Sequence, residues 1–442
     1  MIAPFSPPMG VVRALIMCGA AATWVGLAGC SHAVRLPPAP PAAEIPDLER
    51  RASANAADLQ VAVRLGAAYW SAERLEDAER SLLRARELDP SHPAPAFFLG
   101  VTYEDMGRYA EARASFERYL ELGASERLQT AVRQRIVLLG RKELEASVRA
   151  AVAGEAGLAG GALDPTAVGL LPFFYTGSEE SLRPLGRAMA GLLATDLSHT
   201  DRLTVIERER VQLLLDEIAL GQSGAVDAAT AARAGRLLGA GRIVQGRVDG
   251  GEDSLLLEAL VLRLEAGAGA DPSALSERDP LRLLFEMQTR MALELYASLG
   301  VELTPAERER VTRRPTENLQ ALLAFGEGLE AGDGARFAAA AGHFAEAVRL
   351  DPGFDEAERR REDAVALDIA SRTSTRGLVL TDGEDLMTEP SPEDWDRLQV
   401  ALRDLWFYLP VGHHRDPVAE ITGTEGFGAN TLGSVQFIFR RP

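Results

Sequence analysis

The chain has 442 residues, which is enough for about two to four domains with sizeable apolar cores. Its formal net charge of −18 argues against a general nucleic-acid binder, because such a protein needs a basic face. Apolar residues make up 46% and charged residues 25% of the sequence, as in ordinary globular proteins.

The first thirty residues have the pattern of an export signal. Arg13 supplies a positive charge, and an apolar run follows from Ala14 to Leu27. This run is shorter than the roughly 20 residues that a membrane-spanning helix needs, and it ends at small residues that suit a cleavage site. The final four residues, Leu27-Ala28-Gly29-Cys30, resemble the lipobox of bacterial lipoproteins.

The lipobox resemblance implies that residues 1–29 are removed and that the thiol of Cys30 carries a diacylglycerol. The alternative is a cleaved secretory signal with an incidental cysteine. Cys18 would leave with the signal, so the mature chain would have one cysteine and no disulfide. By resemblance to lipoprotein sorting in Gram-negative bacteria, Ser31 implies the outer membrane, with the bulk of the chain facing the periplasm.

A proline-rich tether is predicted for residues 30–47. Its closely spaced prolines disfavour helix and favour an extended polyproline II conformation. The tether would hold the folded part of the chain away from the bilayer.

A helical repeat is predicted within residues 48–153. Leu65, Gly66, Tyr69, Ala78 and Leu82 recur 34 residues later as Leu99, Gly100, Tyr103, Ala112 and Phe116. This period and pattern resemble tetratricopeptide (TPR) repeats, in which small residues let the two helices of a repeat approach each other. We expect two repeats over 59–125, completed by flanking helices near 48–55 and 126–153, because two repeats are fewer than such stacks usually need.

The resemblance also implies a binding groove, since the first helix of each repeat lines a peptide site in that family. Trp70 and Phe97 would be its apolar anchors, and Glu104 and Asp105 its acidic contacts. The alternative is that this face packs against the neighbouring domain, and the sequence leaves both open. The matching positions are Gln60, Val63, Ala67, Trp70, Phe97, Val101, Glu104 and Asp105.

Strands and helices alternate within residues 160–266, after a glycine-rich linker. A strand is predicted at 167–174, a helix from Leu185 to Leu197 and a short strand at 203–206. Two more helices and a hairpin over 242–264 follow. This order predicts an α/β sandwich of about four strands with helices on one side.

Several short segments of this region resemble the curli-assembly CsgG family of envelope lipoproteins, which includes FlgO-like proteins and the penicillin-binding-protein activator LpoB. The alternative is a generic α/β domain, since Gly241 and Arg242 depart from the family pattern. The Glu207–Arg208 pair is interpreted as a surface ion pair, with a subunit interface as the alternative. The segments are Leu171-Pro172-Phe173, Val205-Ile206-Glu207-Arg208, Leu237-Leu238-Gly239-Ala240 and Ile243–Val248.

Curli-type members form oligomeric pores by contributing long amphipathic hairpins. A spanning strand needs about 9–11 residues of alternating polarity and an aromatic girdle. The hairpin at 242–264 has no girdle, and its strands look like core. The sequence therefore predicts a relative without a pore.

The rest of the chain is predicted to be mostly helical. After a loop at 266–280, residues 280–372 contain a helix to Leu299 and a second TPR-like unit at 316–352. In the C-terminal region, 373–442, a terminal strand is predicted at 433–439. The His413-His414 pair is interpreted as part of a surface turn, not a metal site.

The fold class is therefore α+β multidomain: N-terminal TPR hairpins, a central CsgG-like α/β domain and further TPR-like helices. No enzyme motif is found, so neither catalysis nor a cofactor or metal is predicted. The function expected is an outer-membrane-anchored periplasmic lipoprotein that acts as an interaction scaffold in envelope assembly and binds envelope proteins or peptides in its groove. The alternatives are an oligomeric component of a curli-type secretion assembly and an activator of a peptidoglycan synthase; a homo-oligomer stays open.

Overall fold

The computed structural model describes residues 39–123, 126–157, 163–218, 228–264, 271–380, 430–432 and 435–437. The chain divides into two compact units, Met1–Gly383 and Glu384–Pro442. Of the second unit, the structure describes the antiparallel strands β7 (Asn430–Leu432) and β8 (Val435–Phe437). β8 lies within the strand predicted at 433–439, whereas β7 precedes it. The signal, Cys30, most of the tether and the His413-His414 pair lie outside the described residues.

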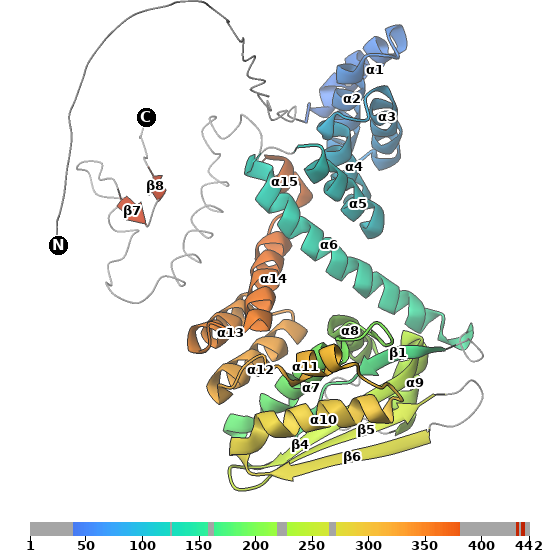
Figure 1. Ribbon diagram of the computed structural model, residues 1–442. Helices are drawn as coiled ribbons and strands as arrows, with labels where there is room; N and C mark the ends of the chain where they lie inside the picture. Colours follow the sequence, from blue (N-terminus) through green and yellow to red (C-terminus); the bar gives the residue numbers. More distant parts are fainter. Residues whose placement is uncertain are drawn as a thin grey trace, which may run out of the picture. The chain divides into compact units, whose positions relative to one another are not determined.

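The described part of the first unit begins with a series of helices (Figure 1). Pro46 lies in the first turn of α1, where a proline is tolerated because its missing N–H has no helical partner. The helical part therefore starts before residue 47, the predicted end of the tether. The elements are η1 (Ala42–Glu44), α1 (Ile45–Ala54), α2 (Leu59–Ser71), α3 (Leu75–Leu88), α4 (Pro93–Asp105), α5 (Tyr109–Glu121) and α6 (Glu126–Ala153).

The pairs α2/α3 and α4/α5 are the two predicted TPR hairpins. Gly66 faces Leu82, and Gly100 faces Phe116: a Cβ atom added at Gly100 would lie 2.6 Å from the Phe116 ring. Only glycine allows this approach of the two helices. The helix α6 packs on α5 as the capping helix of the stack, and it also contacts α8, α9 and α14.

The central domain is a six-stranded mixed sheet in the order β3-β1-β4-β5-β6, with β2 beside β4. β1 pairs in parallel with β3 and with β4, and β2 pairs in parallel with β4. β4, β5 and β6 form an antiparallel meander. The strands are β1 (Asp164–Leu170), β2 (Phe174–Tyr175), β3 (Thr204–Val205), β4 (Ala240–Gly250), β5 (Leu255–Arg263) and β6 (Asp271–Asp279).

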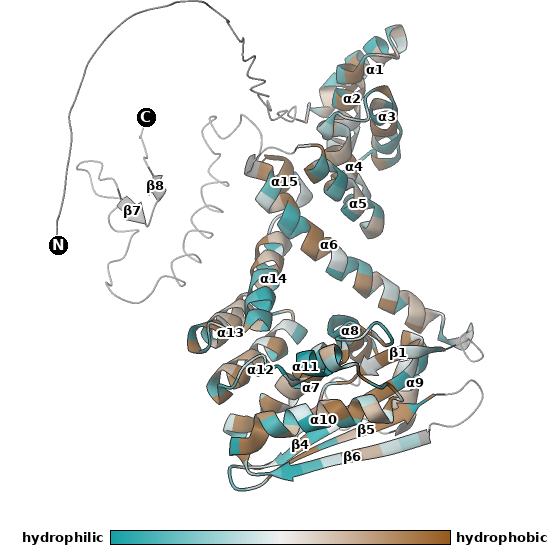
Figure 2. Ribbon diagram, in the orientation of Figure 1, coloured by the Kyte–Doolittle hydropathy of each residue, from teal (hydrophilic) through white to brown (hydrophobic). Residues whose placement is uncertain are grey.

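The sheet is larger than the sequence indicated, and the prediction of a loop at 266–280 was wrong for residues 271–279, which form β6. β6 occupies Asp271–Asp279 and pairs with β5 along its whole length. Its composition is polar and rich in residues with weak strand propensity, as its colours in Figure 2 show. β6 is an edge strand that is held by its backbone pairing with β5. Its side chains therefore do not show the apolar pattern by which a strand is recognised in a sequence.

Helices cover both faces of the sheet, not one as predicted. Val244 and Val248 of β4 join one core with α7 (Leu185–Leu197) and α10 (Leu284–Ser298). Ile243, on the opposite face, joins a second core with α8 (Arg208–Glu217) and α9 (Ala228–Leu238). Alternate residues of a strand point to opposite faces, so β4 is buried on both faces at Ile243 and Val244, whereas Arg247 further along the strand is exposed.

The second TPR-like unit packs on the first of these cores. α12 contacts α7, and its Gly328 faces Phe344 of α13, as in the N-terminal repeats. The Gly332-Asp333-Gly334 stretch is the turn that ends α12. The remaining elements are η2 (Glu155–Gly157), η3 (Glu180–Leu182), η4 (Leu281–Leu283), α11 (Pro305–Thr312), α12 (Leu319–Asp333), α13 (Phe337–Leu350), α14 (Asp355–Arg372) and α15 (Thr375–Leu380).

Candidate functional site

The candidate site is the inner face of the N-terminal repeats, defined as the side formed by α2, α4 and α6. The short helix α15 lies on this face and contacts both α4 and α6. Leu378 of α15 is 1% exposed and belongs to the apolar core of the repeats. The inner face therefore holds a segment that is distant in sequence.

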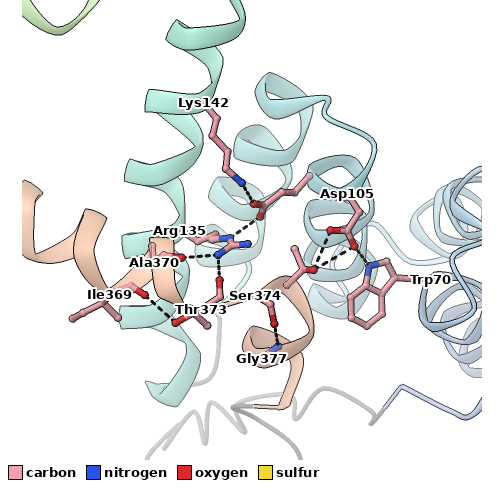
Figure 3. A network of polar contacts seen from close by, with 11 residues as sticks. Trp70, Asp105, Arg135, Lys142, Ile369, Ala370, Thr373, Ser374 and Gly377 are labelled. Carbon is pink, nitrogen blue, oxygen red and sulfur yellow. Dashed lines mark hydrogen bonds and ion pairs between the residues drawn. The ribbon is translucent and has the colours of Figure 1, made fainter. Parts of the chain in front are cut away.

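Asp105 connects α15 to the repeats. Its Oδ2 accepts a hydrogen bond of 2.7 Å from Trp70 Nε1, and its Oδ1 accepts one of 3.0 Å from Thr375 Oγ1 (Figure 3). The buried indole N–H thereby has a partner, which a buried tryptophan usually requires. Arg376 adds an ion pair of 2.9 Å with Glu73, in the turn after α2.

Glu104 is the centre of a buried ion-pair network next to Asp105. Its carboxylate accepts from Arg135 Nε at 2.6 Å and from Lys142 Nζ at 2.8 Å, both on α6 (Figure 3). Arg135 also donates to the backbone oxygens of Ala370, at 2.9 Å, and Thr373. These bonds join α4, α6 and the end of α14. The charges are paired and hydrogen-bonded, as burial of ions requires.

The predicted groove residues lie in different environments in the structure. Trp70 and Asp105 lie together at the α15 contact, and Glu104 lies in the network beside it. Gln60 is exposed, and Val63, Ala67 and Val101 are buried. Phe97 is a correction: it is 0% exposed and its ring packs on three other rings of the repeats, so it is a core residue and no groove anchor. Those rings belong to Phe98, Phe116 and Tyr119.

Sequence reasoning missed Glu73, Arg135, Lys142 and α15. Arg135 and Lys142 lie on one side of α6, seven residues apart, which is two helical turns. That spacing could have indicated a shared acidic partner. Nothing in the sequence links α15 to Asp105, which lies 270 residues before Thr375.

A second polar cluster joins α8 to the second TPR-like unit, around a cavity of about 60 Å³. Arg208 Nη1 pairs with Asp333 Oδ1 at 2.6 Å, and Arg187 Nε pairs with Asp333 Oδ2 at 3.1 Å. The predicted Glu207–Arg208 surface pair is therefore replaced by a largely buried contact with α12. Burial raises the pKa of Glu209, but the guanidinium groups of Arg360 and Arg208 and the hydrogen bonds to the carboxylate together outweigh it and keep that pKa below its usual range.

Among the described residues, no cluster of three or more histidine, cysteine, aspartate or glutamate side chains has the arrangement of a metal site. Over the same residues, no helix combines the length and apolar character needed to cross a bilayer. The inner face engages α15 through a hydrogen-bond acceptor, an acidic group and an apolar contact.

Comparison with known proteins identifies two modules. Residues 172–254 match the family described as curli production assembly/transport component CsgG, and residues 96–123 match the tetratricopeptide repeat family. The chain therefore combines a CsgG-type α/β segment with tetratricopeptide repeats.

Among solved structures, the LpoB C-terminal domain from Salmonella enterica, in selenomethionine form, is similar to part of the chain. It is 12% identical, has a TM-score of 0.21, and the match covers 30% of this chain and 94% of that one. No curated protein matches the chain.

Proposed function

We propose that this chain is an outer-membrane-anchored periplasmic lipoprotein, held through Cys30, that acts as a protein–protein interaction scaffold in envelope assembly. The observation that carries the proposal is the inner face of the N-terminal repeats, which engages a short helix through Asp105, Glu73 and an apolar contact. Concave repeat surfaces of this type bind extended or helical segments of partners. The match to a curli assembly/transport family supports the envelope setting.

The sheet favours a scaffold over a pore component. Leu255 and Leu257 of β5 are buried in one core, and Leu262 is buried in the core on the opposite face. A strand in a membrane barrel turns one row to lipid and the other to the lumen. In the β4–β5 hairpin, by contrast, one row is buried in the core with α7 and α10, and Ile243 and Leu262 on the opposite face are buried in the core with α8 and α9, which supports a role inside the fold.

The paired carboxylates of the inner face, Glu104 and Asp105, support binding and not catalysis. Glu104 is fully engaged by Arg135 and Lys142, and Asp105 by Trp70 and Thr375. Each carboxylate holds two elements together. We propose, accordingly, that the chain has no enzymatic role.

Site-specific photo-crosslinking in cells tests this function. A photoreactive residue replaces Gln60, exposed at a predicted inner-face position of α2, and a matched variant carries it at Arg84, exposed on α3. We expect Gln60 to give a discrete adduct with an envelope protein, and Arg84 to give none. Equal labelling at both positions, or no adduct at Gln60, would contradict an inner-face scaffold.

A further inference from the structure

We propose that α15 is a ligand that the chain supplies to itself, closing the inner face of the N-terminal repeats until a partner peptide displaces it. That peptide would present a hydroxyl to Asp105, a basic side chain to Glu73 and an aliphatic side chain to the apolar core. In the chain these groups are Thr375, Arg376 and Leu378. The inference rests on the proposed function of the same face and specifies its partner.

The contact between α15 and the N-terminal repeats is small. α15 has six residues, too few for a helix that is stable by itself, so its contacts must hold it in place. Leu378 is buried, whereas Leu380 is 59% exposed. The side chains of Arg376 and Glu73 are 62% and 80% exposed, and exposed ion pairs contribute little. Displacement of α15 therefore gives up the burial of Leu378, the packing of Val379 and polar contacts at exposed side chains.

The chain just before α15 is firmly attached at Ala370 and Thr373. Arg135, itself buried and paired with Glu104, holds the backbone oxygens of Ala370 and Thr373. Figure 3 shows this anchor beside the looser contact of Asp105 with the start of α15. Release can thus stop at Ser374 and leave α14 in place. A segment tethered so close has a high effective concentration, which keeps the face closed when no partner is present.

The groups that hold α15 also define the chemistry of a suitable partner. Glu104 is neutralised by two cations, so the acidic groups at the α15 contact are Asp105 and Glu73. They favour a peptide with a hydroxyl followed directly by a basic residue. The buried position of Leu378 adds an aliphatic side chain two residues further on. The proposed partner segment therefore has the pattern hydroxyl, basic, any residue, aliphatic.

A binding experiment with the chain's own segment tests the proposal. A fluorescent peptide of residues 372–380 is titrated into the soluble protein that starts at Ser31, as wild type, Leu378→Asp and Leu380→Asp. Both substitutions add one negative charge to α15, but only Leu378 is buried. We expect Leu378→Asp to free the face and bind the peptide at least 10-fold tighter than wild type, with Leu380→Asp unchanged. Equal affinity of the three proteins would overturn the proposal.

A charge reversal at exposed positions gives a second test that does not depend on a buried substitution. Arg376→Glu in the protein should weaken closure and strengthen peptide binding, and the same change in the peptide should weaken it. Glu73→Arg in the protein should restore binding of the reversed peptide. Absence of this rescue would also overturn the proposal.

The two experiments separate the levels of the argument. If Gln60 yields its adduct while no protein binds the peptide, the face is a scaffold and α15 is not its ligand. If the peptide binds with the expected order of affinities and Gln60 yields no adduct, closure by α15 is supported and the proposed envelope scaffold is contradicted.

Discussion

Glu104 shows, at the scale of one residue, how the inner face is held together. The side chain is 3% exposed and that of Arg135 is 6% exposed, so neither ion can be hydrated if its partner is lost. Glu104→Gln keeps the shape and removes the charge. We expect it to lower the free energy of unfolding of the repeats by about 3–5 kcal/mol, because an unpaired buried guanidinium remains.

The matched control is Glu121→Gln. Glu121 pairs with Arg118 on α5, and the side chains are 65% and 50% exposed. Such pairs contribute about 0.2–1 kcal/mol at most. Denaturant unfolding, with hydrogen exchange of α4 and α6 to assign the loss, measures both variants. A similar small loss in both would show that the network is not critical.

Asp196 predicts a pH dependence of stability. The side chain is buried between α7 and α10, accepts a hydrogen bond from Gln288, and leaves Oδ1 without a partner. Burial raises the pKa of Asp196 to about 8, whereas an unfolded aspartate has a pKa of about 3.9. Between these values the folded state holds more protons than the unfolded state, so stability falls as pH rises.

Asp196→Asn should remove this dependence. We expect its melting temperature to change less than that of wild type between pH 5 and pH 7, a window that costs the wild type up to about 3 kcal/mol. Asp201→Asn, at an exposed position, is the control and should follow wild type. Parallel pH curves for wild type and Asp196→Asn would show that the buried carboxyl is charged in the folded state.

Cys30 carries the anchor prediction. Cys30→Ser removes the thiol that a diacylglycerol would modify, so we expect loss of palmitate labelling and release of the chain from membranes into the soluble periplasm. Two or three acyl chains bind a membrane far more firmly than one, so the shift should be nearly complete. Cys18→Ser, within the signal, should leave labelling intact. Membrane association of Cys30→Ser equal to wild type would exclude the lipid anchor.

The residues that the sequence placed well are those set by local packing rules. The repeat pattern located Trp70, Glu104 and Asp105 beside the inner face, because their positions follow from the 34-residue period. Their partners did not follow, since ion pairs between distant helices have no local signal. Phe97 was misplaced because an aromatic residue on helix A fits a core and a groove equally well.

At the scale of elements, the glycines of the repeats give a sharp test. Gly100→Ala would place a Cβ 2.6 Å from the ring of Phe116, which is fully buried and cannot move away freely. We expect a loss of about 1–3 kcal/mol, the usual cost of overpacking. Gly140→Ala on α6 meets nothing within 4 Å and should stabilise by about 0.5–1 kcal/mol, the helix propensity of alanine over glycine.

Thermal unfolding of the two variants reads out the difference. Opposite signs of the change in melting temperature support close helix–helix contact at Gly100. If Gly100→Ala were as stable as Gly140→Ala, the repeat would have to separate its helices more than this packing allows.

The elements differ in how far sequence alone reveals them. α6 was predicted with its observed bounds, and α7 likewise, because their apolar faces are regular. β6 was missed because its residues are polar and it becomes a strand only through its pairing with β5. The helices α8 and α9 were predicted from the sequence, but their place on the second face of the sheet was not. The sequence of a strand does not show which helix packs on which of its faces.

At the scale of the whole molecule, the remaining question is whether the CsgG-type segment assembles. Light scattering of the soluble form that starts at Ser31 answers it. We expect the mass of a single copy, because β4 and β5 bury residues on both faces of the sheet inside the fold, so the β4–β5 hairpin is not an amphipathic one that copies could share. Curli-type assembly depends on such hairpins, so their burial here favours a monomeric scaffold.

A discrete ring of eight or more copies would reverse that reading and favour the export alternative. The exposed edge of β6 would then be the first surface to test, because an edge strand has unpaired backbone groups that a second copy can bind. Ser276→Pro removes one backbone donor from that edge strand and should break a ring built on β6, while a ring held by the repeats would survive it. A monomer, in contrast, leaves the inner face and its own α15 as the surface on which partner binding depends.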